Sequence, residues 1–337
     1  MLEGGIPVNL TLCAELSILS IGENRLTGKI SSEIGSLRKL AFLNLQKNNM
    51  TGPIPPSLGN LSSLTVLALA SNNLVGNIPE LLGQSRSLSF FAISDNNLSG
   101  MIPPSLFNIS SMNAFSNSYN KFKGSISPGI GLNMPNLQIM SLSGNEFSGQ
   151  IPASLSNASQ LQKLNFGSNN FVGQLPASFG NFPNLQLLNF ESNNLGTNSS
   201  NDLGFISFLT NCSNLEMVSL SNNSFGGVLP NSIANFSTQL TRLYLGGNQI
   251  TEMIPKTLGN LNNLILLTLE ENLFTGIIPA SLGKLQKLQK LYLNSNRLSG
   301  RIPSSLGNLT QLFELYLSAN ELEGSIPPNI GNCKICR

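Results

Sequence analysis

The sequence contains no histidine and no tryptophan, and its only aspartates are Asp95 and Asp202. Imidazole is the commonest general base and metal ligand in enzymes, so its absence argues against most catalytic and metal-dependent chemistries. Charged residues make up 10% of the chain and the formal net charge is +2, which does not suggest a nucleic-acid or polybasic membrane surface. We therefore expect a protein that is not an enzyme, uses no cofactor or metal and binds no nucleic acid.

Long apolar runs are also missing. No window approaches the roughly 18 consecutive apolar residues of a membrane span, and no signal peptide follows Met1. Met1 is followed directly by LEGGIP, which matches the second half of a motif that recurs along the chain. The chain is therefore expected to begin inside a repeat array.

The recurring motif is clearest in Leu288–Pro303, LQKLYLNSNRLSGRIP, which reads LxxLxLxxNxLxGxIP. Thirteen copies follow one another at a spacing of 24 residues, lengthened to 25 after Met112 and Leu215 and to 30 after Leu185. Their first positions are Leu16, Leu40, Leu64, Leu88, Met112, Leu137, Leu161, Leu185, Leu215, Leu240, Leu264, Leu288 and Leu312. A fixed period of this length with this consensus predicts a leucine-rich-repeat solenoid, in which stacked coils share one core.

Each part of the motif has a physical interpretation. The LxL segment alternates apolar and polar residues, which predicts a short strand that pairs in parallel with the next copy. The asparagine at the ninth position is present in every copy and is expected to form a buried hydrogen-bonded ladder. The glycine permits a tight bend, and the Ile-Pro that follows suits a second extended segment. We predict an α/β repeat solenoid: a right-handed superhelix with a parallel concave sheet, mostly strand and coil, with few short helical turns on the outer side.

The repeats also set the expected boundaries. Residues 1–15 form a partial repeat, residues 16–335 form the repeat domain, and the long eighth repeat occupies residues 185–214. One period after Leu312 falls on Cys336, so residues 336–337 are expected to be a truncated end. Terminal repeats normally carry a polar cap. Neither end of this sequence shows one, so we expect the chain to be a fragment or a truncated gene product.

Three copies depart from the consensus. The fifth places Asn117 at a core position, which predicts a weak point or a bend, and the tenth places Glu252 in the glycine slot. The eighth continues after Leu195 with GTNSSNDLGFISFLTNCSN. There Asp202 is predicted to cap a short helix that covers the core on the outer side and leaves the strands intact. Its core-covering residues are expected to be Leu203, Phe205, Ile206, Phe208 and Leu209.

The cysteines bear on the composition of the core, and the glycosylation sequons bear on the cellular compartment. Cys13, Cys212 and Cys333 occupy a slot that elsewhere holds leucine or isoleucine, so we interpret them as small buried side chains. The terminal CKIC pair has no further ligands, which argues against a metal or redox site. Eleven Asn-x-Ser/Thr sequons favour a secretory-pathway glycoprotein. They are Asn9, Asn49, Asn60, Asn97, Asn108, Asn157, Asn198, Asn211, Asn222, Asn235 and Asn308.

Side chains that the consensus leaves free are the candidates for binding. The x of LxL holds three of the four tyrosines, all in the last four copies, and tyrosine and arginine are enriched at binding hot spots. This predicted ligand-binding surface comprises Arg242, Tyr244, Glu270, Glu271, Lys290, Tyr292, Asn294, Glu314 and Tyr316. Tyr-x-Leu is also good strand sequence, so a purely structural interpretation stays open.

A second, apolar patch precedes it. The column Ile18, Phe42, Val66, Phe90, Ala114 and Ile139 is apolar where exposure is expected, and Phe42, Val66 and Phe90 are its strongest members. Leaning into strand neighbours explains this column as well as ligand binding does.

The consensus LxGxIPxxLGNLxxL resembles the plant-type leucine-rich repeat of receptor-like kinase ectodomains. The segment from GKLQKLQKLYL to NIGNCK and the long repeat NLGTNSSNDLGFISFLTNCSNL are similar to one pattern-recognition subfamily. That subfamily holds the receptor for bacterial elongation factor Tu and a rice bacterial-blight resistance receptor. The resemblance implies an extracellular domain of a single-pass plasma-membrane receptor that senses a peptide or microbial protein in immunity. It also implies a co-receptor kinase of the somatic-embryogenesis receptor-like type, and a kinase domain that lies outside this chain.

Two alternatives share the same repeat. One is a developmental peptide-hormone receptor ectodomain, and the other is a soluble protein that resembles polygalacturonase inhibitors. The inhibitors are shorter arrays with capping cysteines of their own, which this chain does not show.

Overall fold

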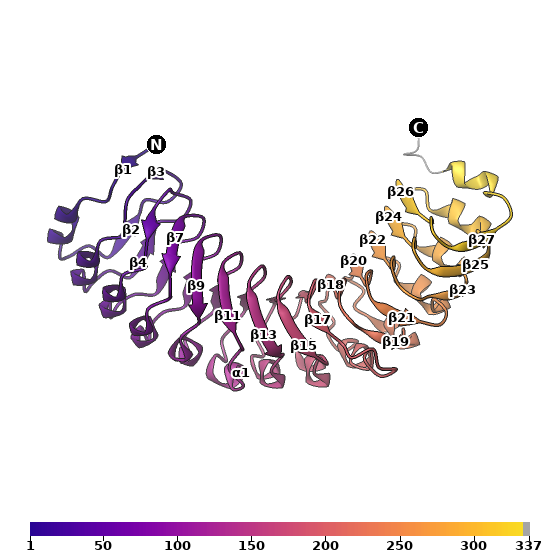
Figure 1. Cartoon of the computed structure of the whole chain (residues 1–337), viewed down its shortest axis with the longest axis horizontal. Helices are drawn as coiled ribbons and strands as arrows, with labels where there is room; N and C mark the ends of the chain where they lie inside the picture. The colour runs from indigo at the N-terminus through magenta and orange to yellow at the C-terminus, as the bar shows by residue number, and fades with distance from the viewer. Residues whose placement is uncertain (333–337) are drawn as a thin grey trace. The chain divides into compact units, whose positions relative to one another are not determined.

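The computed structural model describes residues 1–332 and separates the chain into two compact units, residues 1–170 and residues 171–337. Each unit is built from the same coil, and the ribbon in Figure 1 repeats strand, turn and outer turn throughout both. The predicted leucine-rich-repeat solenoid is confirmed.

The LxL segment of each copy forms a three-residue strand, which we call a repeat strand. In the first unit these are β2 (Ile18–Ser20), β4 (Phe42–Asn44), β6 (Val66–Ala68), β8 (Phe90–Ala92), β10 (Ala114–Ser116), β12 (Ile139–Ser141) and β14 (Lys163–Asn165). In the second unit they are β16 (Leu187–Asn189), β18 (Met217–Ser219), β20 (Arg242–Tyr244), β22 (Leu266–Thr268), β24 (Lys290–Tyr292) and β26 (Glu314–Tyr316). Within each unit, consecutive repeat strands pair in parallel and equivalent positions of the motif face one another. This register lines up the free side chains of the motif in columns on one face, the strand face.

After the ladder asparagines the chain forms second strands of two to five residues, which in most copies run up to or through the glycine bend. They are β1 (Glu3–Gly4), β3 (Arg25–Leu26), β5 (Thr51–Gly52), β7 (Asn73–Gly76), β9 (Asn97–Met101), β11 (Lys121–Gly124), β13 (Glu146–Gln150), β15 (Asn170–Gly173), β17 (Asn194–Leu195), β19 (Gly226–Val228), β21 (Gln249–Thr251), β23 (Thr275–Ile277), β25 (Arg297–Arg301) and β27 (Glu321–Glu323). In most copies the proline after the bend, which cannot donate a hydrogen bond, ends this segment before an outer turn.

The outer turns are nearly all 3₁₀ helices of five residues. They are η1 (Val8–Leu12), η2 (Ser32–Ser36), η3 (Pro56–Asn60), η4 (Glu80–Gln84), η5 (Pro104–Asn108), η6 (Ala153–Asn157), η7 (Ala177–Asn181), η8 (Asn231–Asn235), η9 (Lys256–Asn260), η10 (Ala280–Lys284), η11 (Ser304–Asn308) and η12 (Pro328–Asn332). Two longer repeats use a four-residue α-helix instead, α1 (Ile130–Asn133) and α2 (Ile206–Leu209). The prediction of few, short helical elements is therefore confirmed for the described residues.

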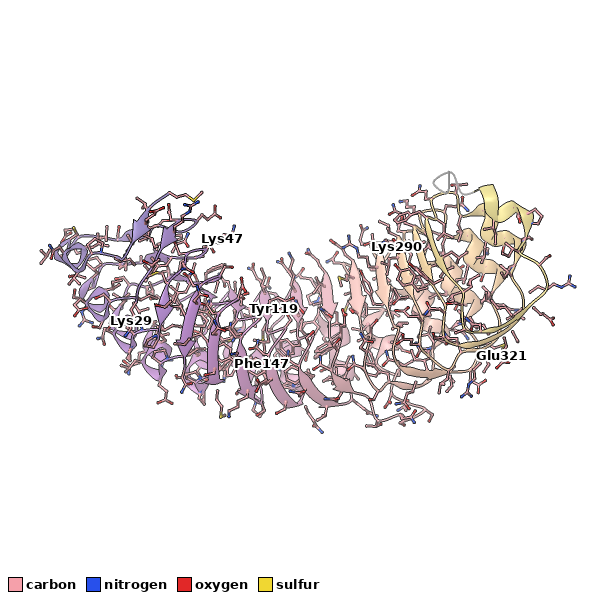
Figure 2. All side chains as sticks on the ribbon, turned by 45° about the horizontal axis from the view of Figure 1, so that its top comes forward. Lys29, Lys47, Tyr119, Phe147, Lys290 and Glu321 are labelled. Atoms are coloured by element: carbon pink, nitrogen blue, oxygen red, sulfur yellow. The ribbon has the colours of Figure 1, made fainter. Side chains whose placement is uncertain are left out.

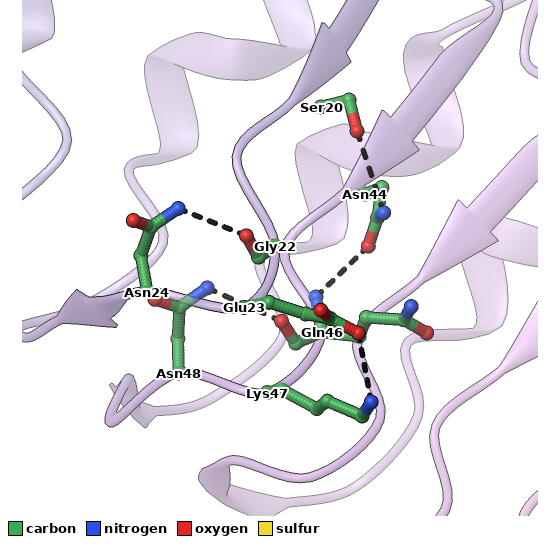
Figure 3. A network of polar contacts seen from close by, with 8 residues as sticks. All are labelled: Ser20, Gly22, Glu23, Asn24, Asn44, Gln46, Lys47 and Asn48. Carbon is green, nitrogen blue, oxygen red and sulfur yellow. Dashed lines mark hydrogen bonds and ion pairs between the residues drawn. The ribbon is translucent and has the colours of Figure 1, made fainter. Parts of the chain in front are cut away.

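The ladder asparagines bond each coil to its neighbours. The Nδ2 of Asn48 donates to the carbonyl of Leu45 in its own coil at 3.0 Å and to that of Ile21 in the preceding coil at 3.1 Å. Its Oδ1 accepts the backbone N–H of Leu26 at 2.9 Å. Figure 3 shows this stretch of the ladder beside the exposed ion pair of Lys47 and Glu23. One amide thus satisfies three buried backbone groups, as the sequence predicts.

A left-handed residue precedes every ladder asparagine. At this position φ lies between 51° for Glu271 and 67° for Gly144, although only two of the thirteen residues are glycines. Even Tyr119, a bulky side chain that is 66% exposed, adopts φ 53° there (Figure 2). A single left-handed residue costs about 1 kcal/mol or more, so the bonds of the following asparagine must enforce the turn. The sequence analysis did not predict this column.

The glycine bend behaves as predicted, and two copies, the eighth and the tenth, lack the glycine. The consensus glycines have φ between 71° and 95°, a region that favours glycine. Glu252 occupies the same slot in the tenth repeat with φ 65°. The bend is therefore kept there at the expense of local strain.

The core is a stack of leucine and phenylalanine side chains between the repeat strands and the outer turns. Phe91, Phe115, Phe122 and Phe147 are among the largest fully buried side chains of the first unit. Asn117 lies among them, fully buried, and neither its Oδ1 nor its Nδ2 has a hydrogen-bond partner in the described part of the chain. An unpaired buried amide costs stability, which agrees with the predicted weak point in the fifth repeat.

The long eighth repeat corrects the predicted role of Asp202. Its carboxylate does not cap α2, which has no side-chain cap. Instead it accepts backbone N–H groups of Thr197 at 2.8 Å, Ser199 at 3.0 Å and Gly226 at 3.1 Å, and so organises the loop that precedes the helix. Leu203, Phe205, Ile206 and Leu209 cover the core as predicted, whereas Phe208 is 48% exposed. Strands β16 and β18 still pair in register, so the insertion leaves the repeat strands intact.

The cysteines divide into two kinds. Cys212 is fully buried, and burial raises the pKa of its thiol to about 11, as expected of an inert core side chain. Cys13 is exposed, so the prediction that it is buried is wrong. Its slot is buried only where the coils on both sides cover it. Cys333 and Cys336 lie outside the described residues.

Replacing one ladder asparagine tests the contribution of the ladder. The Nδ2 of Asn169 donates to the carbonyls of Leu142, Phe166 and Gly167, each at 3.1 Å, and its Oδ1 accepts the N–H of Phe147 at 3.0 Å. We expect Asn169→Ala to lower the free energy of unfolding by about 2–3 kcal/mol, because the buried N–H of Phe147 loses this acceptor and three buried carbonyls each lose one donor. Urea denaturation followed by circular dichroism measures it. The adjacent exposed Asn170→Ala is the matched control, and equal stability of the two variants would contradict the ladder's role.

Asp202 makes stability depend on pH. Burial opposes its ionisation, but the hydrogen bonds from Thr197, Gly226 and Ser199 outweigh burial and hold the pKa of the carboxyl below its ordinary value of 3.8. A carboxyl with a lowered pKa stabilises the fold above the unfolded-state pKa, and the stabilisation is lost as pH falls through the folded-state pKa. We expect Asp202→Asn to cost about 1–3 kcal/mol near neutral pH. The difference from the wild type should shrink below about pH 3.8. Asp95→Asn, at an exposed turn, is the control, and a pH-independent difference for Asp202→Asn would reject the assignment.

Candidate ligand-binding surface

The last four repeat strands place the predicted binding residues on one face. Parallel pairing aligns Arg242, Leu266, Lys290 and Glu314 in one column and Tyr244, Thr268, Tyr292 and Tyr316 in the next. In each strand the leucine between these positions points to the core and is buried, except in the last. Alternation along a strand therefore turns both columns to the strand face.

Four of these side chains and Phe313 form one contact network, which we call the tyrosine cluster: Lys290, Tyr292, Phe313, Glu314 and Tyr316. The rings of Tyr292 and Tyr316 meet edge to face, with centroids 4.8 Å apart and planes at 88°. The hydroxyl of Tyr292 donates to Glu314 Oε2, and Lys290 Nζ lies 2.6 Å from Glu314 Oε1. Lys290 Nζ also lies 5.3 Å from the ring centre of Phe313. Figure 2 labels Lys290 in this part of the chain.

The cluster is electrostatically satisfied. Bonds from Lys290 and Tyr292 hold the pKa of the Glu314 carboxyl below its usual value, so it stays charged. The hydrogen bond to Glu314 raises the pKa of Tyr292 to about 12, so the phenol stays protonated. A ring held by a neighbouring ring and by a hydrogen bond loses little conformational entropy on binding. Tyr316 is 50% exposed and Phe313 is 41% exposed, so the cluster presents rigid aromatic surface to solvent.

Glu270 contrasts with the cluster. Its side chain is half-buried, and its Oε2 is buried without a hydrogen-bond partner among residues 1–332. Burial raises the pKa of this carboxyl above its ordinary value. The carboxylate lies over Gly246, where a Cβ would stand 2.3 Å from Oε1.

The remaining predicted residues lie on the same face outside the cluster. Tyr244 is half-buried on β20, separated from Tyr292 by the strand of Thr268. Arg242 is exposed, Asn294 is half-buried, and Glu271 is exposed at the left-handed turn position. The structure thus brings together Lys290, Tyr292, Glu314 and Tyr316, and leaves Arg242, Tyr244, Glu271 and Asn294 as its surroundings.

Sequence reasoning missed Phe313, Thr268 and Gly246. Phe313 was detectable in principle, since no other copy has an aromatic residue directly after its first position. Gly246 and Thr268 become relevant only through their contacts with Glu270, which no motif predicts.

The predicted apolar patch lies in the first unit. Ile18, Phe42, Val66 and Phe90 stand opposite one another on β2, β4, β6 and β8. Phe42 and Val66 are half-buried by their strand neighbours, whereas Ile18 is 63% and Phe90 39% exposed. Its ends are therefore more accessible than its middle.

All eleven sequon asparagines are exposed. Five of them, Asn60, Asn108, Asn157, Asn235 and Asn308, are the last residue of a 3₁₀ turn on the outer side. None lies in a repeat strand among the described residues. Glycans at these positions would leave the strand face uncovered.

Residues 1–332 contain neither a metal-binding group nor a membrane-spanning helix. No group of three or more histidine, cysteine, aspartate or glutamate side chains could hold a metal ion. In the same range, no helix combines the length and apolar character needed to span a bilayer.

Family models match much of the chain. The leucine-rich-repeat model of a single copy matches residues 39–61, 136–158, 160–182, 214–236 and 311–333, and a leucine-rich-repeat model of several copies matches residues 238–298. Together these segments cover just over half of the chain.

Curated relatives match over shorter stretches. The chain is 51% identical over 76 residues to the LRR receptor-like serine/threonine-protein kinase EFR of Arabidopsis thaliana, a match that covers 23% of this chain and 7% of that protein. It is 54% identical over 68 residues to the receptor kinase-like protein Xa21 of Oryza sativa subsp. japonica, covering 20% of this chain and 7% of that protein. The chain therefore spans only a small part of these relatives.

Solved structures match along almost the whole chain. The plant peptide hormone receptor RGFR1 in complex with RGF2 is 35% identical with a TM-score of 0.89, over 98% of this chain and 52% of that one. The Arabidopsis receptor kinase HAESA in complex with the peptide hormone IDA and the co-receptor SERK1 is 30% identical with a TM-score of 0.76, over 99% of this chain and 62% of that one. On these matches and on its own repeats, the chain belongs to the leucine-rich-repeat family, and its repeats are of the kind found in plant receptor-kinase ectodomains.

Proposed function

We propose that this chain is the ligand-binding part of a plant receptor kinase, on the extracellular side of the plasma membrane, and that it recognises a peptide or microbial protein on its strand face. The observation that carries the proposal is the tyrosine cluster. It exposes two aromatic rings on positions that the repeat does not need for folding. Rigid aromatic side chains with a polar tip are enriched at binding hot spots.

The surface around the cluster supports the same conclusion. Arg242, Glu271 and Asn294 surround the rings with polar groups, and an aromatic centre with a polar rim is the anatomy of protein interfaces. Five exposed sequons end 3₁₀ turns on the outer side, so glycans at these five positions would not block access. A strand face that accepts an extended ligand needs no further pocket.

Two kinds of ligand are consistent with this surface. The resemblance of the C-terminal repeats and of the long eighth repeat to pattern-recognition receptors favours a microbial ligand and a role in immunity. The similarity to a peptide hormone receptor in complex with its hormone favours an endogenous peptide. We place the immune role first because two receptor kinases of the resembled subfamily match this chain at about half of the residues over stretches of 76 and 68 residues.

The proposal includes a second protein. HAESA forms a complex with a peptide hormone and the co-receptor SERK1. By analogy, we propose that a co-receptor kinase of the same type joins this chain once ligand is bound, near the last repeats. Co-receptor and ligand would then share the surroundings of Tyr316.

The ligand class can be tested with a receptor chimera. The chain is joined to the membrane span and kinase of EFR and expressed in leaf tissue, and the oxidative burst is measured. Bacterial extracts and a panel of synthetic plant peptides are the two probes. A burst with extract alone supports immunity, a burst with one peptide alone supports a hormone receptor, and no response to either contradicts the receptor proposal.

The tyrosine cluster should determine sensitivity in this assay. We expect Tyr292→Ala and Tyr316→Ala each to raise the half-maximal dose at least tenfold, which is the effect of losing a hot-spot side chain worth about 1.4 kcal/mol or more. Tyr119→Ala, which removes the fourth tyrosine from an exposed turn, is the matched control. An unchanged dose response at equal surface expression would exclude the cluster from ligand binding.

Glycosylation should follow exposure. We expect the chain, secreted from plant cells, to lose mass on treatment with a glycosidase that removes N-linked glycans. Peptide mapping should find Asn60, Asn108, Asn157, Asn235 and Asn308 occupied, because they end exposed outer turns. Asn60→Gln should remove the mass of a single glycan, and a chain without any shift would rule out the glycoprotein assignment.

A further inference from the structure

Glu270 and Thr268 leave two polar groups without partners on the strand face. Thr268 is 3% exposed and its Oγ1 has no hydrogen-bond partner, and Glu270 Oε2 is likewise buried and unpaired in the described structure. The two residues are two positions apart around the end of one repeat strand. The Thr268 hydroxyl lies close enough to Glu270 to stabilise the ionised form of its carboxyl group. The two groups nevertheless lack hydrogen-bond geometry. A buried carboxylate oxygen and hydroxyl without donors cost free energy that a bound donor would recover.

No cation among residues 1–332 forms an ion pair with this carboxylate. The ammonium of Lys290, on the adjacent strand, forms an ion pair with Glu314, with 2.6 Å between Nζ and Oε1. Arg242, two strand positions from Tyr244, makes no ion pair in the part of the chain that the structure describes. The charge nearest in sequence is the carboxylate of Glu271, which also disfavours ionisation of Glu270. The site therefore has an excess of negative charge.

Tyrosines on the two adjacent strands flank the acceptors, and a glycine lies beneath the carboxylate. Tyr244 and Tyr292 stand on either side of Thr268 in the strand register. Gly246 provides the space in which the carboxylate lies, since a Cβ there would be 2.3 Å from Oε1. Aromatic faces beside a carboxylate favour a planar cation.

We propose that Glu270 and Thr268 form a subsite for a basic side chain of the ligand, with arginine preferred. A guanidinium carries five N–H donors in one plane and can donate to a carboxylate and a hydroxyl together, while its faces contact tyrosine rings. A lysine ammonium would pair with the carboxylate but could not stack. The inference rests on the proposed function, because it assigns a ligand group to a residue beside the tyrosine cluster.

The test uses a phage-displayed library of random dodecapeptides. Peptides are selected on the wild-type chain and counter-selected on the Tyr292→Ala, Tyr316→Ala double variant, so that those retained depend on the cluster. We expect an arginine at a constant position among them. Each peptide is then synthesised with arginine and with citrulline, which is nearly isosteric but uncharged, and its Kd is measured by calorimetry.

The structure predicts how four chains will bind the arginine peptide. Glu270→Gln should weaken binding about thirtyfold or more, as expected when one partner of a desolvated charge pair is lost. Gly246→Ala keeps the charge but displaces the carboxylate, and should weaken binding to a similar extent. Glu146→Gln, which neutralises an exposed carboxylate on β13 in the first unit, is the matched control and should have no more than a twofold effect. The Glu270→Gln variant should bind the citrulline peptide no more weakly than it binds the arginine peptide, and no more weakly than the wild type binds the citrulline peptide.

Each result decides a different question. Retained peptides that lack a basic residue, or that bind Glu270→Gln as tightly as wild type, overturn the subsite and leave the tyrosine cluster as the binding surface. Failure to retain any cluster-dependent peptide rejects the proposed function and the subsite with it. Thermal melting of all variants separates loss of binding from loss of fold.

Discussion

Hydrogen bonding between neighbouring coils is the constraint on which every other feature of this molecule depends. A coil of 24 residues buries backbone groups in its turn that it cannot pair by itself, and the ladder asparagine satisfies three of them at once in two coils. The cost of leaving these groups unpaired explains why the asparagine never varies, and why the residue before it accepts a left-handed conformation even when it is Tyr119 or Glu271. Stability here is a property of adjacent coils rather than of one central core.

That constraint also decides where variation is tolerated. Asp202 shows the principle in the long eighth repeat, because its carboxylate accepts three backbone N–H groups, two in its own loop and one in the next coil. The insertion is thus accommodated on the outer side, and β16 still pairs with β18 in register. Asn117 shows the opposite case, since a polar side chain at a core position finds no partner and remains a local weakness. Substitutions that respect the ladder are absorbed, and those that enter the core are not.

The strand face carries two contrasting electrostatic arrangements on adjacent strands. In the tyrosine cluster every charge and hydroxyl of Lys290, Tyr292 and Glu314 is paired, so the rings are held in place before any ligand arrives. One strand away, Glu270 and Thr268 are desolvated without being paired. Pre-organisation lowers the entropic cost of binding, whereas unpaired buried acceptors reward only a ligand that brings the right donors. Together they combine affinity with selectivity on positions that folding leaves free.

The sequence by itself determined the coil, its period, the parallel repeat strands, the asparagine ladder, the glycine bends and the columns that reach the strand face. These follow from local periodicity and hydrogen-bonding capacity, which repeat thirteen times and so cannot be misread. Only the tertiary structure decided which free residues act together. Tyr292 meets Tyr316 and Glu314 because parallel register brings residues 22–24 positions apart into contact, and Glu270 lies over Gly246 with its Oε2 unpaired among the described residues. Cys13 was predicted wrongly because burial at its slot depends on the neighbouring coil. Asp202 was predicted wrongly because its carboxylate accepts N–H groups from its own loop and from Gly226 in the next coil, which the local motif does not describe.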